Sequence, residues 1–301
     1  MEITESLEHD LKQAPAWFHA SIAIKPRLED LQHPLGNLKY QVWDREETNN
    51  IVILIHGTGA HKRWWDPIAP LFTQDFTVIA PDLPGMGESN HRAKYDFEGF
   101  SDSILAILDQ EDITPANHKI YFVGHSLGGH LAGFMASEFP ELAAGLIMID
   151  SPIRPPSYDY EEHISTGPLR KIKYYEDKVS ILERFRLMPA QDCKNFWYLR
   201  YIAEYSIQNL DAGWRWRFDD KLFATLKRLQ GYEFNFQCPS LFIAGGNSLL
   251  LGSKIMSYIK EEFKGRMSIE VIEHAAHHIP LDEPIGLISI INEYLDRWGT
   301  K

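Results

Sequence analysis

Ile120-Tyr121-Phe122-Val123-Gly124-His125-Ser126-Leu127-Gly128-Gly129 is the stretch that decides the fold of this chain. It begins with an apolar run and leads into helical spacing over residues 129–139, which predicts a buried strand that turns directly into a helix. Gly124 and Gly128 stand two residues before and two residues after Ser126, where side chains would crowd the bend. The pattern G-x-S-x-G in this setting predicts a strained Ser126 whose hydroxyl stands above the sheet. The N–H of Leu127, at the start of the helix, points at the same space and could stabilise a negative charge there.

Other apolar runs repeat this strand pattern on both sides of the quoted stretch. They are continuous rather than alternating, which is typical of parallel strands that are covered on both faces, and helical patterns lie between several of them. We therefore predict an α/β fold with a mostly parallel central sheet flanked by helices. Residues 37–42 alternate more and are expected to form an antiparallel edge strand. The other expected strands are residues 51–55, 77–80, 146–149, 241–244 and 268–272.

The regular alternation stops between residues 151 and 237. This segment is too long for a loop, is rich in aromatic residues and has helical spacing in parts. We interpret it as an inserted, mainly helical cap, so that residues 1–150 and 238–301 form the core domain. Most of its aromatic side chains are expected to form the core of the cap itself.

Composition limits the possible partners and the cellular compartment. The 301 residues carry a net charge of −12, which disfavours nucleic acid as a partner. The two cysteines fit neither a metal-binding spacing nor a disulfide framework, so a reducing cytoplasm is the expected location. We see no signal peptide and no apolar run long enough for a membrane span. The oligomeric state does not follow from the sequence.

The serine turn is accompanied by a second motif, His56-Gly57-Thr58-Gly59, directly after the first buried run. Together they resemble the α/β-hydrolase family over nearly the whole chain. The resemblance implies a serine hydrolase with Ser126 as nucleophile, and an oxyanion hole formed by the N–H groups of Thr58 and Leu127. A dinucleotide-binding loop is disfavoured, because Lys62 stands where its third glycine would be.

A serine hydroxyl needs a general base, which in this family is a histidine late in the chain. Residues 274–284 contain His274, His277 and His278. By its distance from the acidic-acidic-Pro run that follows, His277 matches the family's register, although Ala276 stands where a glycine is more common. His278 is the alternative base, and His274 is expected to be structural. A metal site that includes Glu273 is disfavoured because no second ligand group has a suitable spacing, so we predict neither a metal nor a cofactor.

The acid of the triad departs from the commonest pattern of the family. Residues 245–251, where many members carry it, contain no Asp or Glu, and Ser248 occupies the usual position. Some members carry the acid one strand earlier, which here corresponds to Asp150. We predict that Asp150 orients the histidine, with Asp282 and Asp82 as weaker candidates.

The substrate is expected to be a small apolar or aromatic ester. Trp64, Trp65 and His125 are candidate pocket residues, and the aromatic segment suggests an apolar acyl or aryl pocket. Thioesters and lactones are related possibilities. Two alternatives stay open: a carbon–carbon bond hydrolase of aromatic degradation, and a non-catalytic ligand-binding member of the fold.

Overall fold

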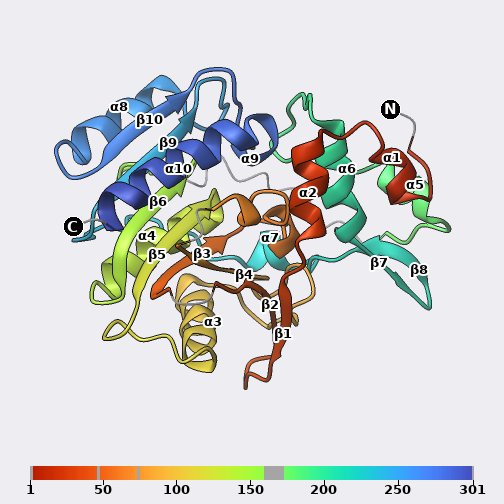
Figure 1. Cartoon of the computed structure of the whole chain (residues 1–301), viewed down its shortest axis with the longest axis horizontal. Coiled ribbons are helices and arrows are strands. Elements are labelled where there is room, and N and C mark those ends of the chain that lie inside the picture. The colour runs from red at the N-terminus through yellow and green to blue at the C-terminus, as the bar shows by residue number, and fades with distance from the viewer. Residues whose placement is uncertain (1–2, 46–47, 73–74, 159–172, 300–301) are drawn as a thin grey trace.

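A computed structural model describes residues 3–45, 48–72, 75–158 and 173–299. Its main element is an eight-stranded sheet in the order β1-β2-β4-β3-β5-β6-β9-β10 (Figure 1). The strands from β4 to β10 run parallel to one another, which confirms the predicted fold class. The strand bounds are β1 Arg27–Leu31, β2 Leu38–Trp43, β3 Asn50–Ile55, β4 Thr77–Pro81, β5 Lys119–His125, β6 Ala143–Ile149, β9 Ser240–Gly245 and β10 Ser268–Ile272.

The antiparallel end of the sheet differs in one respect from the prediction. Strand β2 is antiparallel as expected, but it is not the edge, because β1 pairs along its outer side. Strand β1 has the sequence Arg-Leu-Glu-Asp-Leu and is mostly exposed. Its charges suit a solvent-facing edge but hide the strand from a search for apolar runs.

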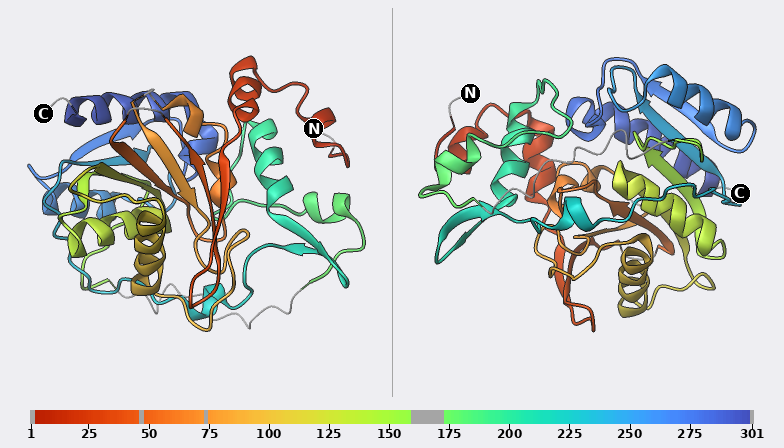
Figure 2. Two further views of the ribbon diagram at one scale, coloured as in Figure 1. Left: turned by 60° about the horizontal axis from the view of Figure 1, so that its bottom comes forward. Right: turned by 180° about the vertical axis from the view of Figure 1, so that it is seen from behind.

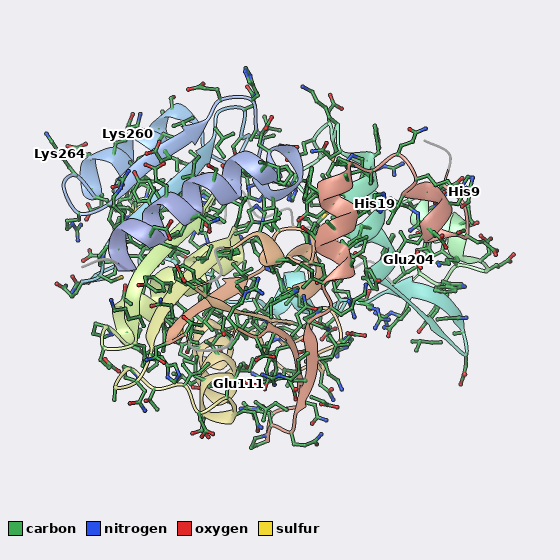
Figure 3. The ribbon with its side chains drawn as sticks, in the orientation of Figure 1. His9, His19, Glu111, Glu204, Lys260 and Lys264 are labelled. Carbon is green, nitrogen blue, oxygen red and sulfur yellow. The ribbon has the colours of Figure 1, made fainter. Side chains whose placement is uncertain are left out.

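Helices cover both faces of the sheet, and successive residues of one strand face opposite layers (Figure 2). In β3, Ile51, Ile53 and Ile55 pack into the layer that holds α3, α4 and α8, whereas Val52 and Leu54 pack into the layer that holds α10. Helix α8 keeps its charged residues outward, as Lys260 shows in Figure 3, and Lys264 just after the helix is exposed as well. The helix bounds are α3 Phe97–Gln110, α4 Leu127–Glu138, α8 Ser253–Glu262, α9 Ile279–Asp282 and α10 Pro284–Gly299, with short 3-10 helices at Lys62–Trp64 and Ala69–Leu71.

The segment between β6 and β9 contains the elements that we predicted to form a cap. Helices are present, as expected, together with an antiparallel hairpin that the sequence did not indicate. Residues 159–172 of the predicted cap lie outside the described residues. The elements are α5 Lys178–Leu182, α6 Phe196–Tyr205, β7 Ile207–Leu210, β8 Gly213–Trp216 and α7 Leu222–Thr225.

The N-terminal segment lies against this insertion (Figures 1 and 2). Helices α1 (Leu7–Asp10) and α2 (Ala16–Ala23) pack beside α6. Arg200 of α6, which is almost fully buried, donates from Nε to Asp10 at 2.8 Å and pairs with Glu204 on its own helix. Phe18 of α2 lies edge-on to Trp197, with ring centroids 4.6 Å apart. The first helices therefore help to hold the inserted segment in place.

Cys193 and Cys238 are both free cysteines. In the part of the chain that the structure describes, no helix combines the length and the apolar character needed to cross a bilayer.

Candidate active site

The predicted site residues gather at one edge of the sheet. Strands β3, β5, β6, β9 and β10 are neighbours in the parallel part of the sheet, so their carboxyl ends lie side by side. Thr58, Ser126, Asp150, Ser248 and His277 all follow the ends of these strands. Residues that are up to 219 positions apart, from Thr58 to His277, are thus brought together by topology alone.

The turn at Ser126 has the strained conformation that the sequence predicts. Ser126 has φ 56° and ψ −117°, a region that residues with a side chain rarely adopt. The two glycines are required by close backbone approach. A Cβ atom on Gly124 would lie 2.1 Å from the carbonyl oxygen of Gly128, and one on Gly128 would lie 2.1 Å from that of Ile55. These contacts press the start of α4 against β3 and lift Ser126 to the sheet edge.

His277 and Asp150 form a buried pair. Nδ1 of His277 lies 2.7 Å from Oδ2 of Asp150, and the two residues are 2% and 0% exposed. The carboxylate can only accept this hydrogen bond, so the proton resides on Nδ1 and the lone pair on Nε2. Asp150 itself has a positive φ of 45°, a strain of the kind that accumulates at functional sites.

Two further groups hold the carboxylate of Asp150. The backbone N–H of Gly245 donates to Oδ1 at 2.8 Å, and the hydroxyl of Ser248 donates to Oδ2 at 2.6 Å. From the sequence, Ser248 stood out only as the position where the family's usual acid is absent. Its place on that loop could have indicated a supporting role, because a short polar side chain there can reach the carboxylate of Asp150 on the neighbouring strand.

The other candidates for base and acid have different surroundings. His278 makes no ring hydrogen bond with the described residues, and burial, followed by the charge of His277, lowers its pKa to about 3. His274 is exposed. Asp282 accepts from the backbone N–H of Ala276 at 2.8 Å and therefore holds the histidine loop.

The loop after β3 carries Thr58, one of the two predicted oxyanion donors. His56 donates from Nδ1 to the carbonyl of Gly57 at 2.8 Å, and its Nε2 accepts from the backbone N–H of Leu83 at 3.0 Å. Burial lowers the pKa of His56, so this neutral tautomer is stable. Because C=O and N–H of one trans peptide point in opposite directions, the bond to the Gly57 carbonyl directs the Thr58 N–H away from His56.

The loop that carries Thr58 lies beside Ser126. A Cβ atom placed on Gly57 would lie 3.2 Å from Cβ of Ser126, so the loop lies against the serine. Among the described residues, no acceptor is hydrogen-bonded to the backbone N–H of Thr58 or of Leu127. Both donors are therefore available to an oxyanion.

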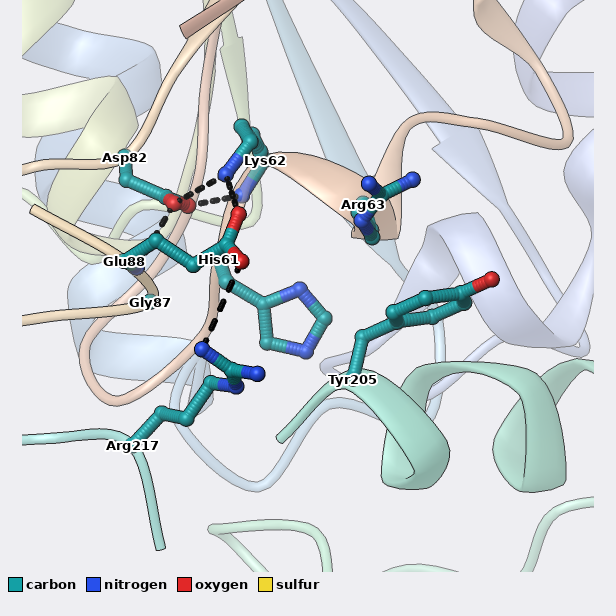
Figure 4. A pocket seen from close by; sticks show the side chains of 8 residues that line it. All are labelled: His61, Lys62, Arg63, Asp82, Gly87, Glu88, Tyr205 and Arg217. Carbon is teal, nitrogen blue, oxygen red and sulfur yellow. Dashed lines mark hydrogen bonds and ion pairs between the residues drawn. The ribbon is translucent and has the colours of Figure 1, made fainter. Parts of the chain in front are cut away.

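A buried ion network supports the same loop (Figure 4). Nζ of Lys62 lies 2.6 Å from Oδ2 of Asp82 and also bonds Glu88, although Lys62 is only 3% exposed. Asp82 also accepts from the backbone N–H groups of Lys62 and Glu88. Burial alone would raise the pKa of Asp82, but the charge of Lys62 brings it below its ordinary value. Asp82 thus bonds backbone, and Glu88 extends the network to Arg217 of the inserted segment.

We expect Lys62→Met to lower the free energy of unfolding by about 3–5 kcal/mol, because it leaves the Asp82 carboxylate buried without its counterion. Thermal unfolding followed by circular dichroism should show a fall of roughly 10 °C in Tm. The matched control is Lys94→Met, which removes an exposed partner of Asp96 and should leave Tm unchanged. Equal Tm values for both variants would contradict a stabilising role of the network.

The three candidate pocket residues have different positions. The ring of Trp64 stacks on His125 at 6.4 Å and lies 5.5 Å from that of His278, so it borders the site. His125 is buried beneath Ser126, and its Nε2 donates to the backbone carbonyl of His277 at 2.9 Å. Trp65 is 1% exposed and belongs to the apolar core on the α10 side, so only Trp64 and His125 stay in our proposal for the pocket.

Comparison with known proteins identifies the family. A family model described as "Alpha/beta hydrolase family" matches residues 52–288, which include most of β3, all later strands of the sheet and every site residue named above. The chain belongs to the α/β-hydrolase family. Its relatives include proteins named as esterases.

Individual relatives are distant or match only in part. An uncharacterised protein of Mycobacterium tuberculosis is 38% identical over 101 residues, which are 33% of this hydrolase but only 28% of that relative. The pimeloyl-[acyl-carrier protein] methyl ester esterase of Neisseria meningitidis is 26% identical over 81% of this chain and 93% of its own length. The solved thioesterase domain from the curacin biosynthetic pathway has a TM-score of 0.71 at 22% identity and covers 88% of this chain and 98% of its own. That last likeness concerns the fold alone.

Proposed function

We propose that this hydrolase cleaves carboxylic esters of apolar or aromatic compounds through an acyl-enzyme on Ser126. The observation that carries the proposal is the 2.7 Å hydrogen bond between Nδ1 of His277 and Asp150. This hydrogen bond leaves Nε2 of His277 as the proton acceptor at the edge of the sheet where Ser126 stands. Membership of the family and the methyl ester esterase among its relatives support ester substrates.

In the proposed reaction, Nε2 of His277 takes the hydroxyl proton of Ser126 as Oγ attacks the ester carbonyl. The tetrahedral oxyanion receives hydrogen bonds from the N–H groups of Thr58 and Leu127. When it collapses, the alcohol leaves with the proton from His277 and the acyl group stays on Ser126. A water molecule, deprotonated by His277, then releases the acid. Asp150 stabilises the imidazolium in both halves, and no cofactor takes part.

The inserted segment supports an apolar substrate. We propose that residues 151–237 form a cap over Ser126 and that Trp64 lines the entrance below it. Several contacts join the segment to the loop after β3: Tyr198 donates to the carbonyl of Trp64 at 2.7 Å, and Tyr201 donates to Asp66 at 2.7 Å. A pocket beneath an aromatic-rich cap would favour acyl or aryl groups over charged ones.

The test is hydrolysis of a series of p-nitrophenyl esters of increasing acyl length, together with labelling by a fluorophosphonate probe. We expect hydrolysis and stoichiometric labelling, both of which are absent in Ser126→Ala. A chain that cleaves a vinylogous diketone but none of the esters would support the carbon–carbon hydrolase instead. A chain that is neither labelled nor active would support a ligand-binding role and overturn the proposal.

A further inference from the structure

Three histidines meet behind Ser126 in an arrangement that the proposed reaction uses only in part. His125 ends β5, and His277 and His278 follow β10, and all three are at most 5% exposed. One ring nitrogen from each lies within 4.8 Å of those of the other two. The ring centroid of His277 lies 4.8 Å from the centroid of His125 and 4.8 Å from that of His278. The proposed mechanism needs only one of these rings as a base.

The outer nitrogens of two of these rings are already held in the way that metal-binding histidines require. A ligating histidine almost always donates its other ring N–H to a carboxylate or a backbone carbonyl, which fixes the tautomer and aims the lone pair. His277 donates from Nδ1 to Asp150, and His125 donates from Nε2 to the carbonyl of His277. The lone pairs of His277 Nε2 and His125 Nδ1 are therefore left for another partner.

The third ring is the one that can adjust. Both ring nitrogens of His278 are buried, and neither makes a hydrogen bond of ordinary geometry with the described residues, although the backbone carbonyls of Met188 and Pro189 lie beside the ring. A buried imidazole without a partner has a free-energy cost that a ligand can relieve. In a tetrahedral site with Zn–N bonds of about 2.0–2.1 Å, two ligand nitrogens lie about 3.4 Å apart. The three ring nitrogens lie within 4.8 Å of one another, so they must approach by up to about 1.4 Å when the ion binds.

We propose that His125, His277 and His278 form an inhibitory site for a divalent transition-metal ion, for which Zn²⁺ is the representative ion. Imidazole nitrogens suit Zn²⁺, and the fourth position of a tetrahedral ion is open to water. The inhibition rests on the proposed function, because it operates through His277 as the base. The bound ion occupies the lone pair on Nε2 that otherwise accepts the proton of Ser126. Removal of the ion by a chelator restores the base, so the inhibition is reversible.

The test measures metal binding and serine reactivity separately on the full chain. Zn²⁺ binding is followed by competition with a chromogenic chelator, and the rate of fluorophosphonate labelling is measured with and without Zn²⁺. We expect one Zn²⁺ per chain, at least a tenfold slower labelling with Zn²⁺, and full recovery after EDTA. Ser126→Ala should bind Zn²⁺ like the original chain, which shows that binding does not depend on catalysis.

The decisive variant is His278→Gln, with His274→Gln on the exposed side of the same loop as its matched control. We expect His278→Gln to be labelled at the original rate without Zn²⁺ but to lose at least about tenfold in Zn²⁺ affinity. His274→Gln should behave like the original chain, and circular dichroism checks that both variants are folded. His278→Phe, which fills the same space without a ligand atom, should show the same loss as His278→Gln.

Two outcomes overturn the metal site: no Zn²⁺ binding to the original chain, or equal affinity in His278→Gln and the original chain. Failure of the proposed function is a different result. In that case the chain is not labelled even without Zn²⁺, whereas Zn²⁺ still binds to Ser126→Ala and depends on His278.

Discussion

We expect His277→Ala to lower kcat for ester hydrolysis by about 10⁶-fold and to abolish fluorophosphonate labelling of Ser126. The serine hydroxyl then has no group to accept its proton, and the hydrogen bond from His277 to Asp150 is lost as well. Residual hydrolysis would come from the oxyanion donors and from substrate binding alone. The measurement is steady-state kinetics on the best p-nitrophenyl ester, with labelling followed by intact mass.

His278→Ala is the matched control for this prediction, since it removes the same side chain from the next residue. His278 has no hydrogen bond to Asp150, so labelling of Ser126 should continue. If folded His277→Ala is labelled normally and His278→Ala is not, the general base is His278 rather than His277.

Asp150→Asn should lower kcat by about 10⁴-fold while the fold stays intact. The backbone N–H of Gly245 donates to Oδ1 and would hold the amide oxygen there, so the amide NH₂ would face Nδ1 of His277. Nδ1 must then accept, the proton moves to Nε2, and the ring can no longer act as a base toward Ser126. Steady-state kinetics, with far-UV circular dichroism as the check on folding, measure the effect. Activity close to that of the original chain would remove Asp150 from the triad.

Ser248 offers a second test of the role of the Asp150 carboxylate, because its side chain reaches the same oxygen as His277. Its hydroxyl and Nδ1 of His277 share Oδ2 of Asp150, at 2.6 Å and 2.7 Å. Ser248→Ala removes only a supporting hydrogen bond and should change kcat by less than about tenfold. Adding Ser248→Asp to Asp150→Asn places a carboxylate within reach of Nδ1, and we expect it to recover at least tenfold of the lost activity. If the double variant is no more active than Asp150→Asn, the negative charge cannot be supplied from the neighbouring strand.

The fold could be predicted largely from local patterns. Continuous apolar runs gave the parallel strands, and the glycines on either side of Ser126 indicated the strained turn because both effects act within a few residues. Strand β1 was missed because its charged residues interrupt any apolar run, and the β7–β8 hairpin was missed because its strands are only four residues long. Their pairing depends on a neighbouring strand rather than on their own composition.

By itself, the sequence determined that Ser126 stands at a sharp strand-to-helix turn. It also placed the candidates for the general base on one short loop late in the chain. Those features are encoded by adjacent residues. Only the tertiary structure decided between His277 and His278 as the partner of Asp150, and only it brought Ser248 to the carboxylate and the ring of His125 to the backbone carbonyl of His277. These contacts join residues that lie from 98 to 152 positions apart. Such distances are closed by the order of parallel strands in the sheet, which no local pattern encodes.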